Sequence, residues 1–417
     1  MKSHRKRRSE GPASPPRPSA TTLLRTNDTT MRAILATLIL AITFPTHSHA
    51  QWEIEESHTT ASLRGIHNVG GGVAWASGTN GTVLRTEDGG YLWQTCAIPP
   101  GAEKLDFRGI QAFDEKTAIV MSSGPGDLSR LYKTTDGCQT WKLLFTNPDK
   151  DGFWDALRAL NEDTYEIAGD SVDHTLVSEK SGHVLPVWRF GPGDDPDSRL
   201  SDYFFELHAE PNEGGFAGSN STLVIGLKPH RDPTWGYQWL ATQTPDHSYV
   251  HREGTEQTPT CEPCRMESMC VETPMSQGTS SAGIFSLAFR EDKFGVAVGG
   301  DYQKPSATLK TAIFSTDAGK SWTLAQTPPH GYRSAVAYDA PTKSWITVGP
   351  NGTDISTDDG RNWRSLAPSS LDDKDANKNW NALSLPFVVG PKGRIGKLRA
   401  TALTPATSIV DKPTKRP

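Results

Sequence analysis

A short motif recurs four times and constrains the fold more than any other feature of this chain. Its frame is Ser/Thr-x-Asp-x-Gly-x-x-Trp, with copies at 86–93 (TEDGGYLW), 134–141 (TTDGCQTW), 315–322 (STDAGKSW) and 356–363 (STDDGRNW). The copy at 134–141 has Cys in place of Gly. A fixed frame that recurs within one chain indicates a structural repeat.

A second landmark, a short apolar run followed by a glycine turn, occurs seven times. The turns lie at Gly78, Gly124, Gly169, Gly218, Gly299, Gly349 and Gly390. Five of the six intervals are 41–50 residues, and the remaining interval, from Gly218 to Gly299, is 81 residues. The long interval predicts a unit with an insertion, which we place at about 241–282.

Each repeat contains four short runs with strand composition separated by acidic or glycine turns, and this pattern is typical of propeller blades. We therefore expect an all-β fold, a seven-bladed β-propeller of four-stranded antiparallel blades, spanning 51–398. The last unit is short and ends at 393–398. We expect it to be completed by a strand from 51–57, which would remove the exposed sheet edges.

The motif residues are expected to be structural. The aspartate side chains can accept backbone N–H bonds within their own turns, and the tryptophans can be buried between blades. The residues concerned are Asp88, Trp93, Asp136, Trp141, Asp317, Trp322, Asp358 and Trp363.

The ends of the chain are expected to lie outside the propeller. The apolar run 33–44, followed by Ser48-His49-Ala50, predicts a signal peptide over 31–50 and a periplasmic or secreted protein with no membrane span after its removal. We expect residues 1–30 to be either a disordered basic extension or a stretch that follows an upstream start codon which the cell does not use. We expect residues 399–417 to form a disordered tail.

The charge balance excludes one class of partner. The formal net charge is −5, and residues 1–50 hold eight Lys/Arg against two Asp/Glu, so the remainder carries −11. An acidic chain is a poor candidate for binding nucleic acid.

The five cysteines should mostly pair in an exported protein. Cys96 and Cys138 are candidates for a disulfide between blades. Cys261, Cys264 and Cys270 cannot all pair with one another, so one bond with a free thiol, or an external partner, is expected. They lack the fourth ligand of a zinc site, so no metal is expected.

The motif copies resemble those of Asp-box (BNR) propellers, the repeat class that includes sialidases. Together with the VGxxG turns and TPPHGYRSAV at 327–336, they make the chain similar to photosystem II stability/assembly factor-like propellers. That resemblance covers about 52–398. It implies a non-enzymatic scaffold that binds a protein partner, such as an envelope membrane protein, and presents an arginine patch to it.

Three arginines align on the first strands of their repeats: Arg64, Arg108 and Arg333. First strands line the central channel of a propeller, and converging guanidinium groups suit a carboxylate or phosphate. Alternatively, each arginine pairs with a neighbouring carboxylate, such as Asp106 or Asp155, and links blades.

Two functions stay open. The first is a partner-binding scaffold that uses the three arginines and Tyr332. The second is a sialidase-type glycoside hydrolase or acidic-glycan-binding propeller, which requires a Tyr nucleophile with a Glu and an acid/base Asp. No spacing demands that second arrangement, so no catalytic residue is assigned. No Gly-x-Gly-x-x-Gly lies between a strand and a helix, and no cofactor is expected.

Overall fold

The computed structural model describes residues 51–173, 183–191, 203–226, 237–255, 266–368 and 372–403. These residues belong to one compact unit that begins at Ser48. The signal peptide, the basic extension, Cys261, Cys264 and residues 404–417 lie outside the described residues. Among the described residues, no helix is long and apolar enough to cross a membrane.

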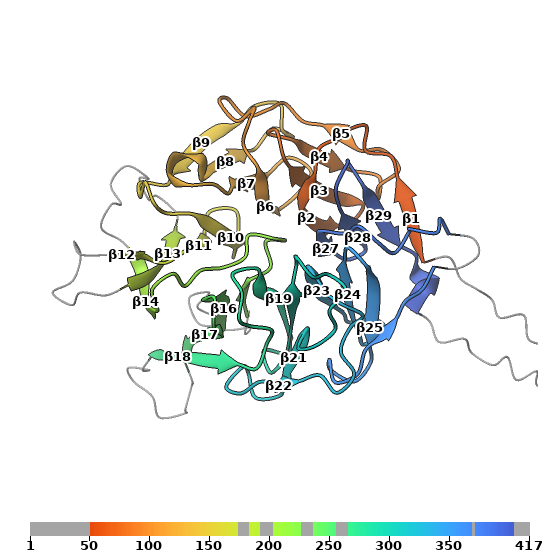
Figure 1. Cartoon of the computed structure of the whole chain (residues 1–417). Coiled ribbons are helices and arrows are strands. Elements are labelled where there is room, and N and C mark those ends of the chain that lie inside the picture. Colours follow the sequence, from red (N-terminus) through yellow and green to blue (C-terminus); the bar gives the residue numbers. More distant parts are fainter. Residues whose placement is uncertain are drawn as a thin grey trace, which may run out of the picture. The chain divides into compact units, whose positions relative to one another are not determined.

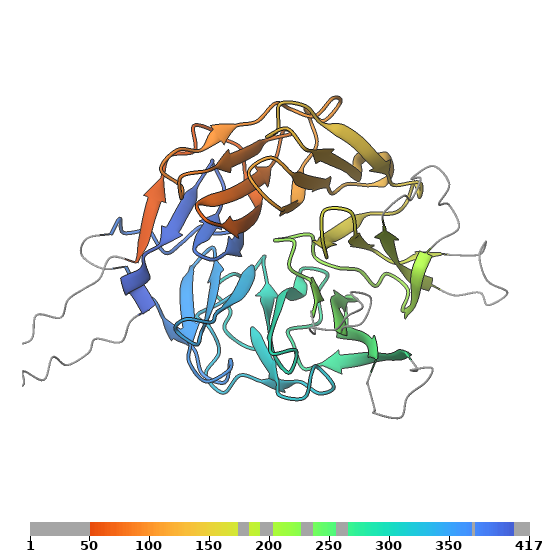
Figure 2. The same ribbon diagram turned by 180° about the vertical axis from the view of Figure 1, so that it is seen from behind.

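Seven antiparallel sheets form the predicted seven-bladed propeller, which Figures 1 and 2 show from opposite faces. Blade 1 contains β2 (Leu63–Gly70), β3 (Val73–Gly78), β4 (Val83–Thr86) and β5 (Gln94–Thr95). Blade 2 contains β6 (Phe107–Ala112), β7 (Ala118–Ser122), β8 (Arg130–Thr134) and β9 (Lys142–Thr146), with the short helix η1 (Gly126–Leu128). Blade 3 contains β10 (Trp154–Ala159), β11 (Tyr165–Gly169), β12 (Val172–Asp173), β13 (His183–Phe190) and β14 (Tyr203–Ala209).

The remaining four blades follow in chain order. Blade 4 contains β15 (Leu223–Ile225), β16 (Tyr237–Gln243), β17 (Ser248–Thr255) and β18 (Met266–Thr273). Blade 5 contains β19 (Ala282–Arg290), β20 (Phe294–Asp301), β21 (Ala312–Ser315) and β22 (Thr323–Leu324). Blade 6 contains β23 (Ala335–Asp339), β24 (Ser344–Gly349), β25 (Gly352–Ser356) and β26 (Arg364–Ser365). Blade 7 contains β27 (Ala382–Ser384), β28 (Phe387–Val389) and β29 (Ile395–Leu398).

Blade 7 is completed by β1 (Trp52–Glu55), which comes from the other end of the propeller sequence. β1 pairs with β29 in antiparallel register, from Trp52 opposite Leu398 to Glu55 opposite Ile395. Pairing the two ends of the sequence in one sheet closes the ring and leaves no open first or last blade.

Two boundary expectations need correction. The stretch 241–282 is no insertion, because it supplies the end of β16 and all of β17 and β18 to blade 4. The error arose because Gly218 does not lie in a turn between the second and third strands; it precedes the first strand of its blade. Residues 399–403, expected to be disordered, include the short helix η3 (Ala400–Leu403), and the Arg399 N–H donates to the Gln51 carbonyl.

The four motif turns share one set of hydrogen bonds. In the first copy, the Thr86 hydroxyl donates to Asp88 Oδ1 and accepts the Gly90 N–H, and the Leu92 N–H also donates to Asp88 Oδ1. The copies containing Asp136, Asp317 and Asp358 repeat these bonds. Each motif tryptophan is buried in a cluster with the preceding blade: Trp93, Trp141, Trp322 and Trp363.

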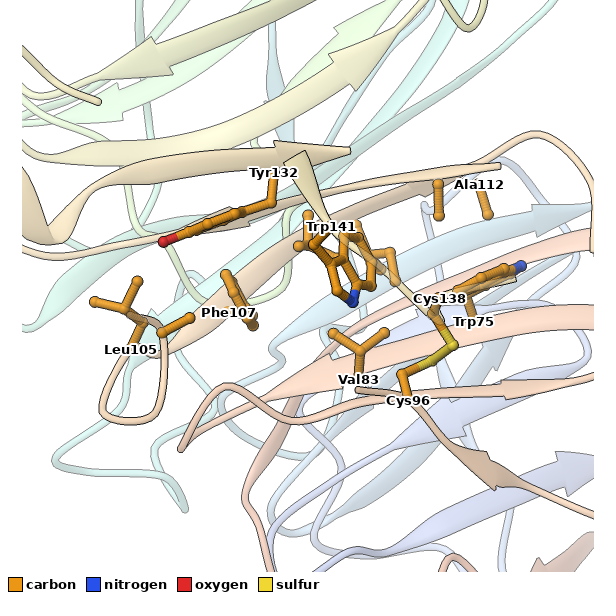
Figure 3. Close-up of a cluster of buried hydrophobic side chains, with 13 residues drawn as sticks. Trp75, Val83, Cys96, Leu105, Phe107, Ala112, Tyr132, Cys138 and Trp141 are labelled. Atoms are coloured by element: carbon orange, nitrogen blue, oxygen red, sulfur yellow. A yellow bond between two sulfur atoms is a disulfide. The ribbon is translucent and has the colours of Figure 1, made fainter. Parts of the chain in front are cut away.

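A disulfide joins Cys96, after β5, to Cys138, in the motif turn of blade 2. Figure 3 shows the bond beside the buried side chains of Trp75, Val83 and Trp141, which fill the space between blades 1 and 2. Cys138 has a φ of +63°, at the position where the other copies have glycine. The disulfide therefore occupies a turn position that favours glycine.

Candidate functional site: the mouth of the central channel

Four inner strands carry a β-bulge at the same position. The register with the neighbouring strand shifts at the second residue of β2, β6 and β10 and at the fourth residue of β19. A bulge re-aims the side chain of its extra residue. The four residues are Arg64, Arg108, Asp155 and Phe285, and with Tyr302, Tyr332 and the segment 214–222 they form what we call the mouth.

Arg64 and Arg108 lie close together in the mouth. Arg108 donates from Nε to Asp106 Oδ2 at 2.8 Å and from Nη1 to the Ala217 carbonyl at 3.2 Å. Arg64 is half-buried, and its Nε has no hydrogen-bond partner within the described part of the chain. Burial lowers the pKa of Arg64, Asp106 opposes that shift, and the charge of Arg108 adds to it. An anion bound here would relieve both the desolvation and the repulsion of the two cations.

Arg333 is not part of this pair, because its alignment is displaced by one residue. The Arg333 N–H donates to the Gly299 carbonyl just as the Leu63 N–H donates to Gly390. Arg333 therefore corresponds to Leu63, and Ser334 to Arg64. Since side chains alternate along a strand, a shift of one residue turns the side chain to the other face.

The Arg333 side chain is instead buried in an ion pair within blade 6. Only 1% of it is exposed, and its Nε and Nη2 both donate to Asp354 Oδ2, the former at 2.8 Å. Asp354 also contacts His330 Nδ1 through Oδ1 at 2.6 Å. Of the three predicted arginines, two reach the mouth, and one of these, Arg108, also pairs with Asp106 as the alternative expected. Arg333 pairs with a carboxylate of its own blade and does not link two blades.

The segment 214–222, which we call the axial segment, leads from blade 3 into blade 4 and reaches toward the centre of the ring (Figure 1). It contacts three other inner strands. Its Ala217 carbonyl accepts from Arg108, its Asn220 Oδ1 accepts the Leu157 N–H at 2.7 Å, and its Ser221 carbonyl accepts the Leu287 N–H at 2.8 Å. No sequence motif marks this segment, and FAGSN at 216–220 has the composition of an ordinary blade turn.

Two carboxyl groups, the buried Asp155 and the half-buried Asp170, lie against the axial segment. Asp155 Oδ2 accepts the Gly215 N–H at 3.0 Å, and the Asp155 carboxyl group interacts with that of Asp170. Burial and the adjacent Asp170 raise the pKa of Asp155, while Arg108 lowers it. Burial raises the pKa of Asp170 to about 6. Across the described ranges, no group of three or more His, Cys, Asp or Glu side chains is arranged to hold a metal ion.

Four aromatic rings adjoin the arginines, and we call them the aromatic shelf: Phe216, Phe285, Tyr302 and Tyr332. Phe216 stacks on Phe285 with ring centroids 3.7 Å apart, and Tyr332 meets Phe285 edge-on at 4.7 Å. Tyr302 lies edge-on to Phe285 at 6.0 Å and is 48% exposed. Burial raises the pKa of Tyr332, and Arg64 opposes this shift. Phe216 precedes Ala217, whose carbonyl accepts from Arg108, so the shelf lies beside the arginines. Sequence reasoning found only Tyr332, because the four rings share no local pattern.

Further exposed apolar side chains lie on the same end of the blades. In an antiparallel meander, the connections entering the first strand and those joining the second to the third strand share one end. Ile98, Leu128, Tyr302 and Leu309 lie in such connections, and all are more than two-fifths exposed. These side chains share one end of the blades with the shelf.

Cys270 lies elsewhere, on β18 of blade 4. It is exposed, and its Sγ is 3.9 Å from His251 Nε2. His251 is buried, and Glu213 and Cys270 raise its pKa to about 9 against the effect of burial. The same nitrogen contacts Glu213 Oε1 at 2.6 Å, so these three side chains do not form a relay through both ring nitrogens.

No family model and no curated protein matches the chain. A solved structure described as YCF48 bound to D1 peptide has 15% identity and a TM-score of 0.50, and covers 85% of this chain and 99% of that chain. YCF48 from Cyanidioschyzon merolae has 16% identity and a TM-score of 0.48, covering 84% and 99%. The WD40 beta propeller domain of Doa1 has 10% identity and a TM-score of 0.49, covering 86% and 100%. At these identities the likeness to the first structure shows the propeller fold alone.

Proposed function

We propose that this chain is an exported, non-enzymatic β-propeller that binds a protein partner through the mouth, as an assembly or stability factor-like scaffold at the cell envelope. One observation carries the proposal: Arg64 and Arg108 are adjacent, partly exposed cations on the first strands of neighbouring blades, and Arg64 has no ion-pair partner among the described residues. Paired guanidinium groups bind carboxylates in planar, bidentate geometry. The ligand groups best suited to them are acidic side chains or a chain terminus.

Two further observations support parts of the proposal. The fold neighbour described as YCF48 bound to D1 peptide is a propeller that holds a peptide, which makes peptide capture a reasonable function for this architecture. The disulfide between Cys96 and Cys138 suits an oxidising compartment, in agreement with the signal peptide expected at 31–50.

The glycoside hydrolase alternative is less well supported by the site. It needs three arginines on one carboxylate, but Arg333 is held by Asp354. It also needs a Tyr that readily loses its proton, whereas burial raises the pKa of Tyr332. An acidic glycan that is bound without hydrolysis remains the second candidate, because two guanidinium groups would also accept a sugar carboxylate.

Affinity capture from an envelope extract tests the proposal. The wild-type protein, residues 51–417, is compared with the Arg64→Gln/Arg108→Gln variant and with Arg364→Gln, which removes an exposed charge on β26. We expect a defined protein that is retained by the wild type and by Arg364→Gln and lost by the double variant. Equal retention by all three folded proteins would contradict binding through the mouth, and retention of acidic glycans alone would favour the second candidate.

A further inference from the structure

The aromatic shelf adjoins the arginine pair, and this arrangement restricts the ligand further than charge alone. We propose that the mouth recognises a peptide segment in which a carboxylate lies next to a bulky apolar side chain: the arginines bind the carboxylate, and Phe216 and Tyr302 bind the apolar group. This inference rests on the proposed function and names the ligand class for the same site.

The contacts of the shelf form a continuous path from cation to exposed ring. Arg64 lies near enough to Tyr332 for each to act on the charge of the other. Tyr332 packs on Phe285, and Phe285 packs on Phe216 and Tyr302. The two buried rings therefore support two rings that remain accessible, of which Phe216 is half-buried and Tyr302 is 48% exposed.

The accessible rings are supported on one side and open on the other. Phe216 and Tyr302 meet edge-on at 6.3 Å, and Phe285 backs both of them. An aromatic side chain fixed in this way loses little conformational entropy on binding, and Tyr and Arg are enriched among the residues that dominate binding energy at interfaces. The shelf is thus pre-organised to pack against an apolar group.

The axial segment couples the two halves of the site. Its Phe216 belongs to the shelf, and the carbonyl of the next residue, Ala217, accepts a hydrogen bond from Arg108. The adjacent Gly215 N–H is held by the buried Asp155 carboxyl. One short stretch of backbone therefore fixes the apolar contact relative to the cation, which sets the spacing that a ligand must match.

A peptide fits this surface better than a sugar acid does. The accessible part of the shelf consists of the rings of Phe216 and Tyr302. A polyhydroxylated ligand would bury its hydroxyl groups against such side chains without hydrogen-bond partners, which is unfavourable. Peptide side chains can cover the same surface without that cost.

A positional-scanning set of acetylated, amidated hexapeptides provides the test. Each pool contains one fixed Glu in a Gly/Ser background, and one other position is varied in turn. We expect pools with Phe, Trp, Tyr or Leu near the Glu to bind the wild type more tightly than the Ala pool by roughly tenfold, the value of burying one such side chain. Replacing Glu by Gln should abolish measurable binding.

Two variants distinguish the shelf from a general apolar effect. Tyr302→Ser removes the exposed ring and should remove most of the preference for aromatic pools while retaining dependence on Glu. Tyr91→Ser is the matched control, because Tyr91 is 88% exposed in the motif turn at the opposite end of blade 1. It should bind every pool as the wild type does.

The outcomes separate this inference from the proposed function. Equal binding of Phe and Ala pools, still dependent on Glu and on Arg64, overturns the shelf inference and leaves the peptide scaffold intact. No binding of any pool at millimolar concentration contradicts both. Binding of glucuronic or sialic acid in place of all peptides overturns both in favour of the glycan candidate.

Discussion

Arg64 and Arg333 offer a matched pair of substitutions with opposite expected results. Arg333→Met removes one partner of a fully buried ion pair and leaves the Asp354 carboxylate, which is 0% exposed, without its guanidinium. Breaking a buried pair in this way costs about 3–5 kcal/mol. His330 Nδ1, 2.6 Å from the other carboxylate oxygen, offers partial compensation. We therefore expect a loss near the lower limit, about 3 kcal/mol in the free energy of unfolding.

Arg64→Met should behave differently. It removes a partly desolvated charge that has no direct ion pair among the described residues and that repels Arg108. Asp106 keeps its contact with Arg108 at 2.8 Å. Replacing such a charge by an apolar side chain of similar size is neutral or slightly stabilising. The change in unfolding free energy should stay below about 1 kcal/mol, whereas capture of an acidic ligand should fall.

Urea unfolding with the disulfide intact, paired with ligand binding in native buffer, measures both quantities. A third variant, Arg333→Met/Asp354→Leu, serves as the control because it removes both charges. It should recover most of the stability lost in Arg333→Met. If Arg333→Met unfolds like the wild type but loses ligand binding, the assignment of Arg333 to a structural ion pair within blade 6 is wrong.

Two other predictions concern the acid pair and the disulfide. Because Asp155 and Asp170 have raised pKa values, the folded state favours their protonated forms. This stabilisation is present below about pH 4 and is lost as the pH rises, which for Asp170 happens through about 6. Asp155→Asn should weaken the dependence of the melting temperature on pH over that range and raise the melting temperature at pH 7. An unchanged dependence of the melting temperature on pH would refute the reasoning. The disulfide closes a separation of 42 residues, so Cys96→Ser/Cys138→Ser should cost about 4 kcal/mol at most. Cys96→Ser/Cys138→Gly should lose about 1 kcal/mol less, because glycine accepts the positive φ; equal losses in thermal unfolding would argue against that explanation.

The sequence was sufficient for the architecture because the blades repeat. The even spacing of glycine turns predicted seven sheets, and the short last unit predicted the pairing of β1 with β29; both predictions are confirmed. The blade 4 boundaries were wrong because Gly218 belongs to the axial segment, a non-repeating element that resembles a blade turn in composition alone. A repeat pattern cannot identify the residues that depart from it.

The mouth was harder to predict than the fold, for a geometric reason. Its shelf combines Phe216, Phe285, Tyr302 and Tyr332, which come from an axial segment, a bulge and two loops, so no spacing connects them. The arginine alignment failed at Arg333 by a single residue. An error of one residue in the alignment does not change the predicted fold. It does reverse the predicted direction of a side chain, because successive side chains of a strand point to opposite faces.

The bulges explain why two arginines are available and the third is not. In β2 and β6, the extra residue at the bulge interrupts the alternation of side chains between the two faces of the blade. The side chains of Arg64 and Arg108 therefore point to neither face and lie at the mouth. In blade 6, the register of β23 with β24 runs without a shift, and Arg333 lies before that strand at the position of Leu63, which is directed into the blade. A cation buried there requires its own carboxylate, and Asp354 supplies it. The number of cations at the mouth is therefore set by where the inner strands bulge, and a count of aligned arginines overestimates it.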